Sequence, residues 1–276
     1  MLTQITPLIL TFNEAPNIDR TLQRLTWARR IVVIDSQSTD ETLEILQSYP
    51  QVQVFQRKFD NHTNQWNYGL EQVHSEWVLS LDADYLLTDE LIAEIDALPK
   101  KELVDSYFVK FKYCVFGKPL QGTLLPPREV LFRRDKAVYV DDGHTQLLKV
   151  KGQSGFLSSY IYHDDRKSLS HWLWAQDRYM LIEQKKLLKT PATELSFGDR
   201  LRKQKILAPF VILIYCLIIN RGILDGWPGW YYAFQRTLAE ILLAIRLIEV
   251  QMHEGRKGDE KKREENNLFF GARDAV

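Results

Sequence analysis

Short apolar runs alternate with amphipathic segments along the first third of the chain. Four runs are apolar almost throughout and predict buried strands, at 6–11, 31–34, 52–55 and 77–81. Between them, apolar residues recur at helical spacing and predict helices at 18–25, around 43–46 and at 64–73. Buried strands that alternate with helices indicate a mostly parallel sheet covered on both faces. We therefore expect an α/β fold of Rossmann-like type.

The pattern changes twice further along the chain. Segments between 103 and 156 alternate in the manner of strands and are broken by Gly and Pro, as in hairpin loops. From Ser168 to about 252 the pattern is helical, and the residues from His253 onward are charged and almost free of apolar side chains. We expect an α/β domain at 1–165 with halves near 1–100 and 101–165, a helical extension at 166–252, and a solvated or disordered tail at 253–276.

Polar residues follow three of the predicted strands, at 11–14, 35–38 and 82–84. Open sheets of this class bind ligands beyond the carboxyl ends of their strands, so these clusters are expected to lie together. Asp82 and Asp84 repel each other as anions unless a cation lies nearby. Mg²⁺ or Mn²⁺ prefers such oxygen ligands and completes its shell with phosphates and water. An Asp-x-Asp sequence alone is a weak signal, and its position after a buried strand is what favours a metal site.

Composition narrows the class of protein. Lys plus Arg and Asp plus Glu number 36 each, so the overall charge does not favour nucleic acid as a partner. Cys114 and Cys216 stand far apart, and we expect two reduced, buried thiols. The N-terminal residues lack the basic and long apolar regions of a secretory signal, which predicts a cytoplasmic location.

Four blocks of sequence resemble family 2 glycosyltransferases in both order and spacing. The blocks read TFNE at 11–14, VVIDSQSTDET at 32–42, NYGL at 67–70 and WVLSLDAD at 77–84. The nearest likeness is to the branch that includes lipopolysaccharide core glucosyltransferases. This resemblance implies a GT-A fold, inverting chemistry and a nucleotide-sugar donor such as a UDP-sugar.

The resemblance also implies roles for single residues. Residues expected to line the nucleotide pocket are Thr11, Phe12, Asn13 and Glu14. Asp35 is expected at the uracil or ribose, Gln65 and Asn67 near the donor phosphates, Asp82 at the ribose or the metal, and Asp84 on the metal. Many members carry two acidic residues where this chain has Asp35 and Ser36, so the base contact departs from the family pattern.

The resemblance is weaker beyond residue 130, in the acceptor half. Arg133 or Arg134 is expected either to pair with phosphate or to be an exposed charge on an edge strand. An inverting transfer needs a general base at the acceptor hydroxyl. The branch has a His-Glu pair where this chain has His144 and Thr145, so the candidates are Asp142, which we favour, Asp141 and His144; the alternative is a simple turn.

His163 follows a strand-like stretch. At this point the related branch is expected to have a histidine facing the active site, which makes His163 a candidate third metal ligand. The competing interpretation is a core or loop histidine.

An apolar run at 206–219 has basic residues on either side. At about 14 residues it falls short of the roughly 20 that span a bilayer. A buried core helix and an interfacial membrane segment are both consistent with it. Trp227, Trp230, Tyr231 and Tyr232 follow, and such aromatic residues beside apolar and basic segments are typical of a membrane interface. We therefore expect peripheral contact through 200–252 with the inner face of the cytoplasmic membrane.

Together these observations predict an inverting, Mg²⁺- or Mn²⁺-dependent glycosyltransferase that builds a cell-surface glycan such as lipopolysaccharide core, on a glycan or lipid-linked acceptor. A polyprenyl-phosphate sugar transferase and a non-catalytic nucleotide-sugar-binding protein are the alternatives. A nucleotidyltransferase would require a Gly-rich, basic phosphate loop near the N-terminus, which this sequence lacks.

Overall fold

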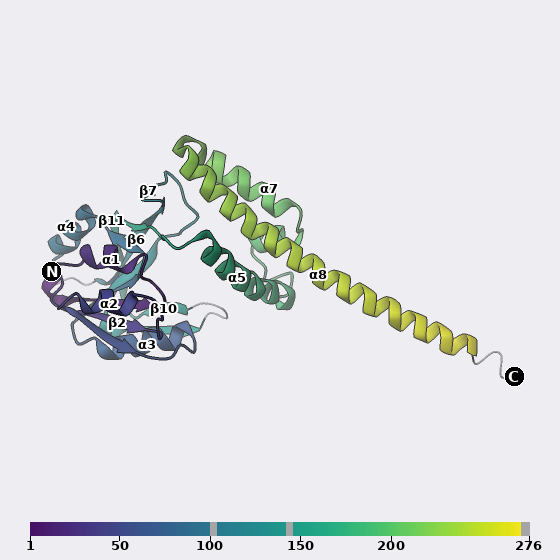
Figure 1. Ribbon diagram of the computed structural model, residues 1–276, viewed down its shortest axis with the longest axis horizontal. Helices are drawn as coiled ribbons and strands as arrows, with labels where there is room; N and C mark the ends of the chain where they lie inside the picture. The colour runs from purple at the N-terminus through teal and green to yellow at the C-terminus, as the bar shows by residue number, and fades with distance from the viewer. Residues whose placement is uncertain (100–103, 142–145, 272–276) are drawn as a thin grey trace. The chain divides into compact units, whose positions relative to one another are not determined.

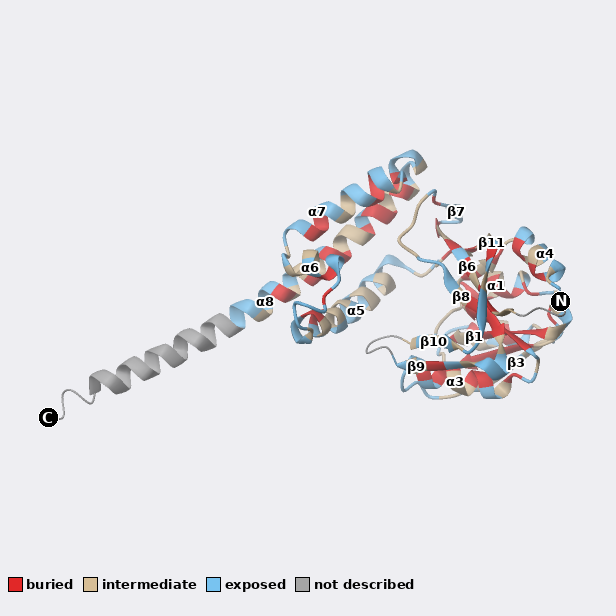
Figure 2. Ribbon diagram, turned by 180° about the vertical axis from the view of Figure 1, so that it is seen from behind, coloured by how far each residue is buried: buried red, intermediate tan, exposed pale blue. Residues whose placement is uncertain are grey.

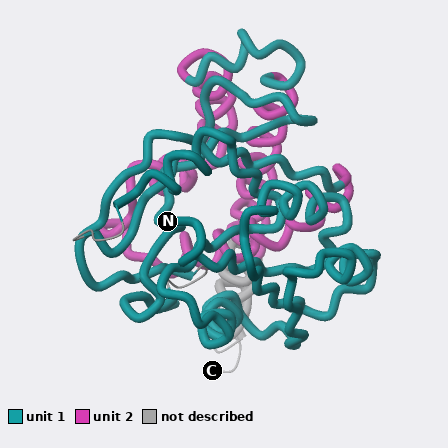
Figure 3. The backbone as a smooth tube through the Cα atoms, turned by 90° about the vertical axis from the view of Figure 1, so that its left-hand side faces the viewer, with its two compact units in different colours: residues 1–167, 220–229 teal, residues 168–219, 230–276 magenta. Residues whose placement is uncertain are grey.

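The computed structural model describes residues 1–99, 104–141 and 146–271, with side chains described as far as His253. The chain divides into two compact units (Figure 3). Unit 1 comprises Met1–Lys167 and Asn220–Gly229, and unit 2 comprises Ser168–Ile219 and Trp230–Val276.

Unit 1 is built on a nine-stranded mixed sheet (Figure 1). Its path is β3 (Val52–Gln56), β2 (Ile31–Asp35), β1 (Ile5–Thr11), β4 (Trp77–Asp82), β8 (Arg128–Arg133), β6 (Val104–Val115), β11 (Gln153–His163) and β5 (Tyr85–Leu87), with β7 (Lys118–Pro119) paired to β6. The first four strands are parallel, and β8 runs antiparallel to both β4 and β6. β9 (Ala137–Asp141) and β10 (Gln146–Val150) form a separate antiparallel pair. The predicted α/β class with a mixed sheet is confirmed.

Helices cover both faces of the parallel strands. Alternate side chains of each strand therefore pack in two different cores, one on each face. Ile31 and Val33 of β2 pack in one core with apolar residues of α1 (Ile18–Gln23), α2 (Thr42–Gln47) and α4 (Asp89–Ala97). Val32 and Ile34 pack in the other core with α3 (His62–Gln72). Strands buried on both faces require continuous apolar runs, which is the pattern that the sequence shows.

A close approach of α3 to β1 explains one of the recognised sequence blocks. A Cβ atom added at Gly69 would lie 2.7 Å from Cδ1 of Leu8, a distance that real Cβ contacts do not show. Any larger residue at this position would force the Leu8 and Ile34 side chains between α3 and the sheet to shift. Asn61 is the N-cap of α3, and its side chain accepts a hydrogen bond from the Asn64 amide at 2.8 Å.

The register of the parallel strands brings their polar ends to one edge of the sheet. Leu10 pairs with Asp82, and Thr11 pairs with Asp35, so β1, β2 and β4 end at the same level. The three polar clusters therefore meet at the carboxyl edge, as predicted from the sequence.

Short helical turns complete unit 1: η1 (Leu2–Gln4), η2 (Arg134–Lys136) and η4 (Gly222–Asp225). The sequence did not predict β5 or α4. Thr88 is the N-cap of helix α4, and its hydroxyl accepts a hydrogen bond from the Leu91 amide at 3.2 Å.

Unit 2 is helical. It contains α5 (Leu169–Lys189), α6 (Phe197–Lys203), α7 (Leu207–Ile214), the π-helical turn η3 (Tyr215–Ile219) and most of α8 (Trp227–Gly271). A small core of Leu187, Leu195, Leu243 and Leu247 joins α5 and α8. Arg202 of α6 pairs with Glu240 of α8 at 2.9 Å, which fixes these two helices together.

Two features of the C-terminal region bear on the sequence-based expectations. The charged residues from His253, expected to be solvated or disordered, continue α8 in helical form to Gly271. They are rich in Glu, Lys and Arg, which have high helix propensity. Over the residues that the structure describes, none of the helices is both long and apolar enough to span a bilayer.

Candidate functional site

Asp84 and His163 form a partly buried pair at the carboxyl edge of the sheet. Oδ2 of Asp84 lies 2.9 Å from Nε2 of His163, and the two side chains are 15% and 21% exposed. The pair is held because β11 ends at His163, which lies opposite Tyr85 on β5, and because the Asp164 amide donates to the Asp84 carbonyl at 3.1 Å. Within the described part of the chain, Oδ1 of Asp84 and Nδ1 of His163 are buried without a hydrogen-bond partner. Each residue therefore retains one polar atom that a ligand can satisfy.

Burial and mutual attraction compete in this pair. Burial alone would raise the pKa of Asp84, but the attraction and hydrogen bond of His163 outweigh it and hold that pKa below its usual value. Burial would likewise lower the pKa of His163, but the Asp84 carboxylate raises it instead. The site therefore favours a negative charge on Asp84 and a positive charge beside it.

Asp82 lies beside this pair but is half exposed, and the Arg128 guanidinium lies near it. Nη1 of Arg128 is 3.9 Å from Oδ2 of Asp82 and donates to the Tyr85 hydroxyl at 2.9 Å. Arg128 begins β8, and because β8 runs antiparallel to β4, its first residue lies where β4 ends. Arg128 thus places a positive charge at the candidate metal site. The sequence alone does not predict this role of Arg128, because the role depends on the direction of β8.

The loops after β1 and β2 are joined by hydrogen bonds around Asp35. The Asp35 carboxylate is fully buried and accepts from the Thr11 hydroxyl at 2.9 Å and from the Ser38 amide and hydroxyl at 2.9 and 2.5 Å. The Asn13 amide donates to the Ser38 hydroxyl at 2.9 Å, and Asn13 Oδ1 accepts from the Thr39 amide at 2.8 Å. These contacts hold the two loops together as one surface. Asp35 lies beneath this surface and supports it.

Asn13 adopts a left-handed backbone conformation, with φ of 53°. Asn tolerates this conformation better than most residues, which explains its position at the sharp turn after β1. The residue before it, Phe12, has an aromatic side chain that is 47% exposed. An exposed aromatic ring beside a fixed polar loop can stack on a planar base.

Glu14 connects the first loop to the segment after β11. Its carboxylate pairs with Lys167 and accepts from Nδ2 of Asn17 at 2.9 Å. Burial, with the nearby Asp84 charge adding to it, raises the pKa of Glu14 to about 7 despite Lys167. Glu14 and Lys167 were joined by folding across 153 positions, and Lys167 was not predicted as a site residue.

Replacing Glu14 with Gln should change how stability depends on pH. The pKa of Glu14 rises from 4.5 to about 7 on folding, so its contribution is fully present below pH 4.5 and is lost as pH rises through 7. The difference between these pKa values corresponds to about 3 kcal/mol. Urea unfolding between pH 4 and pH 8 should therefore show a smaller loss of stability with rising pH for E14Q than for the unmodified protein. Parallel profiles would contradict the raised pKa.

Gln65 and Asn67 lie on α3, and their amides have different partners. Gln65 is fully buried; its Nε2 donates to the Ser36 hydroxyl at 3.0 Å, which places it under the loop after β2. Asn67 instead bonds the main chain of Tyr139 twice, at 2.9 and 3.0 Å. The structure thus gives Asn67 the task of joining α3 to β9. The expected contacts of Gln65 and Asn67 with the donor phosphates stay predictions.

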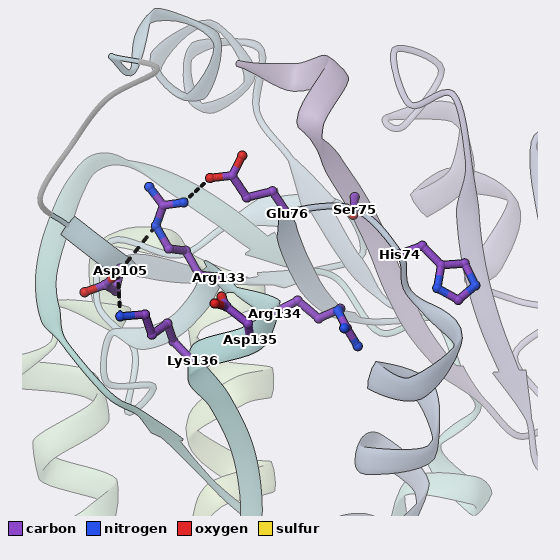
Figure 4. A pocket seen from close by; sticks show the side chains of 8 residues that line it. All are labelled: His74, Ser75, Glu76, Asp105, Arg133, Arg134, Asp135 and Lys136. Carbon is purple, nitrogen blue, oxygen red and sulfur yellow. Dashed lines mark hydrogen bonds and ion pairs between the residues drawn. The ribbon is translucent and has the colours of Figure 1, made fainter.

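Arg133 lies at the opposite edge of the sheet, and its expected place in the substrate site stays a prediction that this position does not support. It pairs with Trp77, the first residue of β4, so about 16 Å of strand separates it from the end of β4 at Asp82. Its guanidinium pairs with Glu76 and with Asp105, the latter at 3.4 Å, and lies over the Trp77 ring. Figure 4 shows Arg133 turned toward these two carboxylates in a surface pocket. The sequence placed Arg133 on a strand but did not give the direction of that strand.

Of the three candidates for the general base, only Asp141 lies among the described residues. Asp141 ends β9, is exposed and pairs with Gln146 of β10. Asp142 and His144 lie outside the described residues. The identity of the base therefore stays a prediction.

The acidic and histidine side chains that the structure describes contain no group of three or more placed to hold a metal ion by themselves. Asp84 and His163 are a pair, with Asp82 and Arg128 at their open side. Such a site suits an ion that takes its remaining ligands from a bound phosphate compound.

This sheet, with an Asp-x-Asp sequence at the end of a central parallel strand and polar loops beside it, defines a GT-A fold. The family model "Glycosyl transferase family 2" matches residues 8–151. The chain belongs to glycosyl transferase family 2.

Similar proteins agree with this family. An uncharacterized glycosyltransferase of Rickettsia bellii is 30% identical over 105 residues, which are 38% of this chain and 35% of the relative. The glycosyltransferase SunS of Bacillus phage SPbeta is 33% identical over 88 residues, or 30% of this chain and 20% of the relative. The matched regions thus span about a third or less of these relatives.

Among solved structures, the mannosyltransferase PcManGT of Pyrobaculum calidifontis, in complex with GDP-Man and Mn²⁺, has a TM-score of 0.50 at 13% identity. The match covers 89% of this chain and 87% of that protein. TarS 1–349 of S. aureus in complex with UDP-GlcNAc has a TM-score of 0.49 at 17% identity, covering 91% and 92% of the two chains.

Proposed function

We propose that this protein is an inverting, divalent-metal-dependent glycosyltransferase that transfers a sugar from a nucleotide-sugar donor, a UDP-sugar in our proposal. The observation that carries this proposal is the partly buried Asp84–His163 pair beside Asp82, in which each member has one polar atom without a partner among the described residues. The family of the chain and the position of the pair at the carboxyl edge of the sheet support it.

The residues at this edge fit Mg²⁺ or Mn²⁺. Asp84 and His163 would hold the ion, with Asp82 beside them, and His163 would give up its proton to the solvent when the ion binds. Mn²⁺ accepts both carboxylate and imidazole ligands. When bound, the ion would neutralise the charge that develops on the departing diphosphate. Asp84 is suited to this task because its pKa is held low, so that its carboxylate is ionised in the neutral pH range.

The remaining residues of the edge would bind and orient the donor. The joined loops after β1 and β2 offer a fixed surface for the nucleotide, with Phe12 exposed for stacking. Fixed orientation of reactants accounts for much of the barrier reduction in transfers of this kind. Arg128 would add a second positive charge near the diphosphate, beside Asp82.

The acceptor hydroxyl needs a base, and we propose Asp142, with Asp141 and His144 as the alternatives. For the acceptor we propose a cell-surface glycan or a lipid-linked sugar, such as lipopolysaccharide core. A protein with such an acceptor would work at the inner face of the cytoplasmic membrane, attached peripherally through residues 200–252. The apolar side chains exposed on α7 and α8 support this attachment.

Replacing Arg128 with Met should lower kcat by roughly 10²-fold, because one preorganised positive group near the developing charge is removed. The guanidinium carbon lies 6.0 Å from the centre of the Phe111 ring, and Met places an apolar side chain of similar length there, so the fold should be unaffected. Steady-state assays with the preferred donor provide the measurement. Arg134→Met at the opposite edge of the sheet is the matched control and should leave kcat unchanged. Equal rates for both variants would remove Arg128 from the donor site.

A donor screen followed by a turnover assay tests the proposed function. Purified protein is heated with each of a set of nucleotide sugars, with Mn²⁺ or with EDTA, and the donor that raises Tm is then assayed for sugar transfer and for hydrolysis. A donor that raises Tm with Mn²⁺ and is turned over is the expected result. Stabilisation without transfer to any acceptor extract and without hydrolysis would instead identify a non-catalytic nucleotide-sugar-binding protein.

A further inference from the structure

Helix α7 of unit 2 exposes the face that a surface helix normally buries. Residues 206–219 contain no charged side chain, yet Leu207, Phe210, Val211, Ile214 and Ile218, at helical spacing, are between 44% and 64% exposed. Figure 2 shows α7 largely in the colour of exposed residues. An amphipathic surface helix packs its apolar stripe against the core and turns polar residues outward. In α7 it is Ala208 and Pro209 that are buried instead.

The apolar surface continues from α7 onto α8, within the same unit. A groove between the two helices is lined by Phe210 and Leu213 from α7 and by Ile241, Ile245 and Ile248 from α8. The three α8 isoleucines are themselves 38% to 56% exposed. We call this surface, Leu207, Phe210, Val211, Ile214 and Ile218 with the three isoleucines, the apolar face.

Basic residues border the apolar face where α6 leads into α7. Arg200 is exposed, Lys203 is partly exposed, and Lys205 lines the end of the groove. Lys205 is fixed there by a left-handed backbone, with φ of 61°, and by its hydrogen bond to Gln251. Between residues 196 and 221 the only acidic residue is Asp199, which is buried and within 3.7 Å of Arg202. The border therefore carries net positive charge, which is complementary to an anionic surface.

We infer that the apolar face docks on a bilayer surface that contains anionic lipids. This inference rests on the proposed function, whose membrane attachment it assigns to particular side chains. The helix lies in the plane of the interface, Phe210 and Ile214 enter the acyl region, and the lysine and arginine side chains meet the headgroup phosphates. The run of 14 residues is too short to cross a bilayer of roughly 20-residue span, which excludes a transmembrane arrangement for it.

Vesicle binding by matched variants tests this inference. Full-length protein is sedimented with vesicles of phosphatidylcholine, with and without 30 mol% phosphatidylglycerol, at two salt concentrations. The test variant is F210E/I214E, and the control is F156E, which removes a similarly exposed phenylalanine from β11 in unit 1. Circular dichroism and Tm show whether both variants fold. We expect binding to the anionic vesicles that weakens with salt, a loss of at least tenfold in F210E/I214E, and none in F156E.

Three results would overturn the inference. These are failure of the unmodified protein to bind anionic vesicles, equal binding by F210E/I214E, or a concentration-dependent dimer that F210E/I214E abolishes, which would make a second copy the occupant of the face. Hydrolysis of the nucleotide sugar, measured in the absence of lipid, distinguishes a failure of membrane docking from a failure of the proposed function. F210E/I214E should hydrolyse the nucleotide sugar at the rate of the unmodified protein. If the unmodified protein does not hydrolyse it, the result contradicts the proposed function and leaves the docking of the apolar face unaffected.

Discussion

Replacing Asp84 with Asn is expected to lower the rate of sugar transfer by roughly 10³-fold or more, since the variant loses the charge that would hold the metal beside the diphosphate. The amide has the same shape as the carboxylate, so packing is preserved. It cannot pair with His163 as an anion, and the attraction that raises the pKa of His163 disappears with it. Initial rates at saturating Mn²⁺ and donor provide the measurement.

Asp135→Asn is the matched control for this variant. Asp135 is an exposed carboxylate in the pocket at the opposite edge of the sheet, so the same chemical change there should leave the rate unaltered. Unchanged turnover in D84N, with its Tm close to that of the unmodified protein, would remove Asp84 from the catalytic centre.

Replacing Asp35 with Ala should destabilise the protein by about 3 kcal/mol and weaken donor binding together with it. The change leaves the buried Thr11 hydroxyl and the partly buried Ser38 amide and hydroxyl without their acceptor, which is itself fully buried. Each unsatisfied buried polar group costs about 1–3 kcal/mol, part of which local rearrangement recovers. Urea unfolding measures the first effect, and titration with the nucleotide sugar measures the second.

Asp60→Ala separates burial from the number of hydrogen bonds. Asp60 also accepts several hydrogen bonds, from Arg57, Asn61 and Asn64, but its side chain is exposed. Water replaces the lost partners there, so Tm should fall far less in D60A than in D35A. Similar losses of Tm in the two variants would contradict the role of Asp35 as a buried support.

The sequence predicted the donor side of the site because parallel strands carry their information locally. Apolar runs marked β1, β2 and β4, and in a parallel sheet the residues after such runs meet at one edge. Thr11, Asp35 and Asp82 could therefore be placed together without knowledge of the strand order. His163 was a candidate ligand from the family resemblance, and the structure brings it to 2.9 Å from Asp84.

The acceptor half could not be predicted in the same way, because it depends on strand direction and on pairing across long stretches of chain. Arg133 and Arg128 lie on the same strand, and only its antiparallel run against β4 decides that Arg128 reaches Asp82 while Arg133 lies at the far edge. The pairing of Glu14 with Lys167 and that of Arg20 with Asp164 likewise join residues far apart in sequence. No local pattern of residues specifies such pairs.

The run at 206–219 shows a limit of hydropathy. An apolar segment of that length is equally consistent with a core helix and with an interfacial helix. The structure distinguishes them through exposure, because Phe210 and Ile214 are 64% and 59% exposed on a helix whose buried side is formed by small residues.

Donor binding with and without metal tests the central claim, that Asp84 and His163 hold a divalent ion on a nucleotide diphosphate. The nucleotide sugar selected in the thermal screen is titrated calorimetrically into the unmodified protein and into D84N, each with Mn²⁺ and with EDTA. We expect binding to the unmodified protein to be at least tenfold tighter with Mn²⁺ than with EDTA, and this dependence to vanish in D84N. Equal affinity of the unmodified protein in Mn²⁺ and EDTA would contradict the claim.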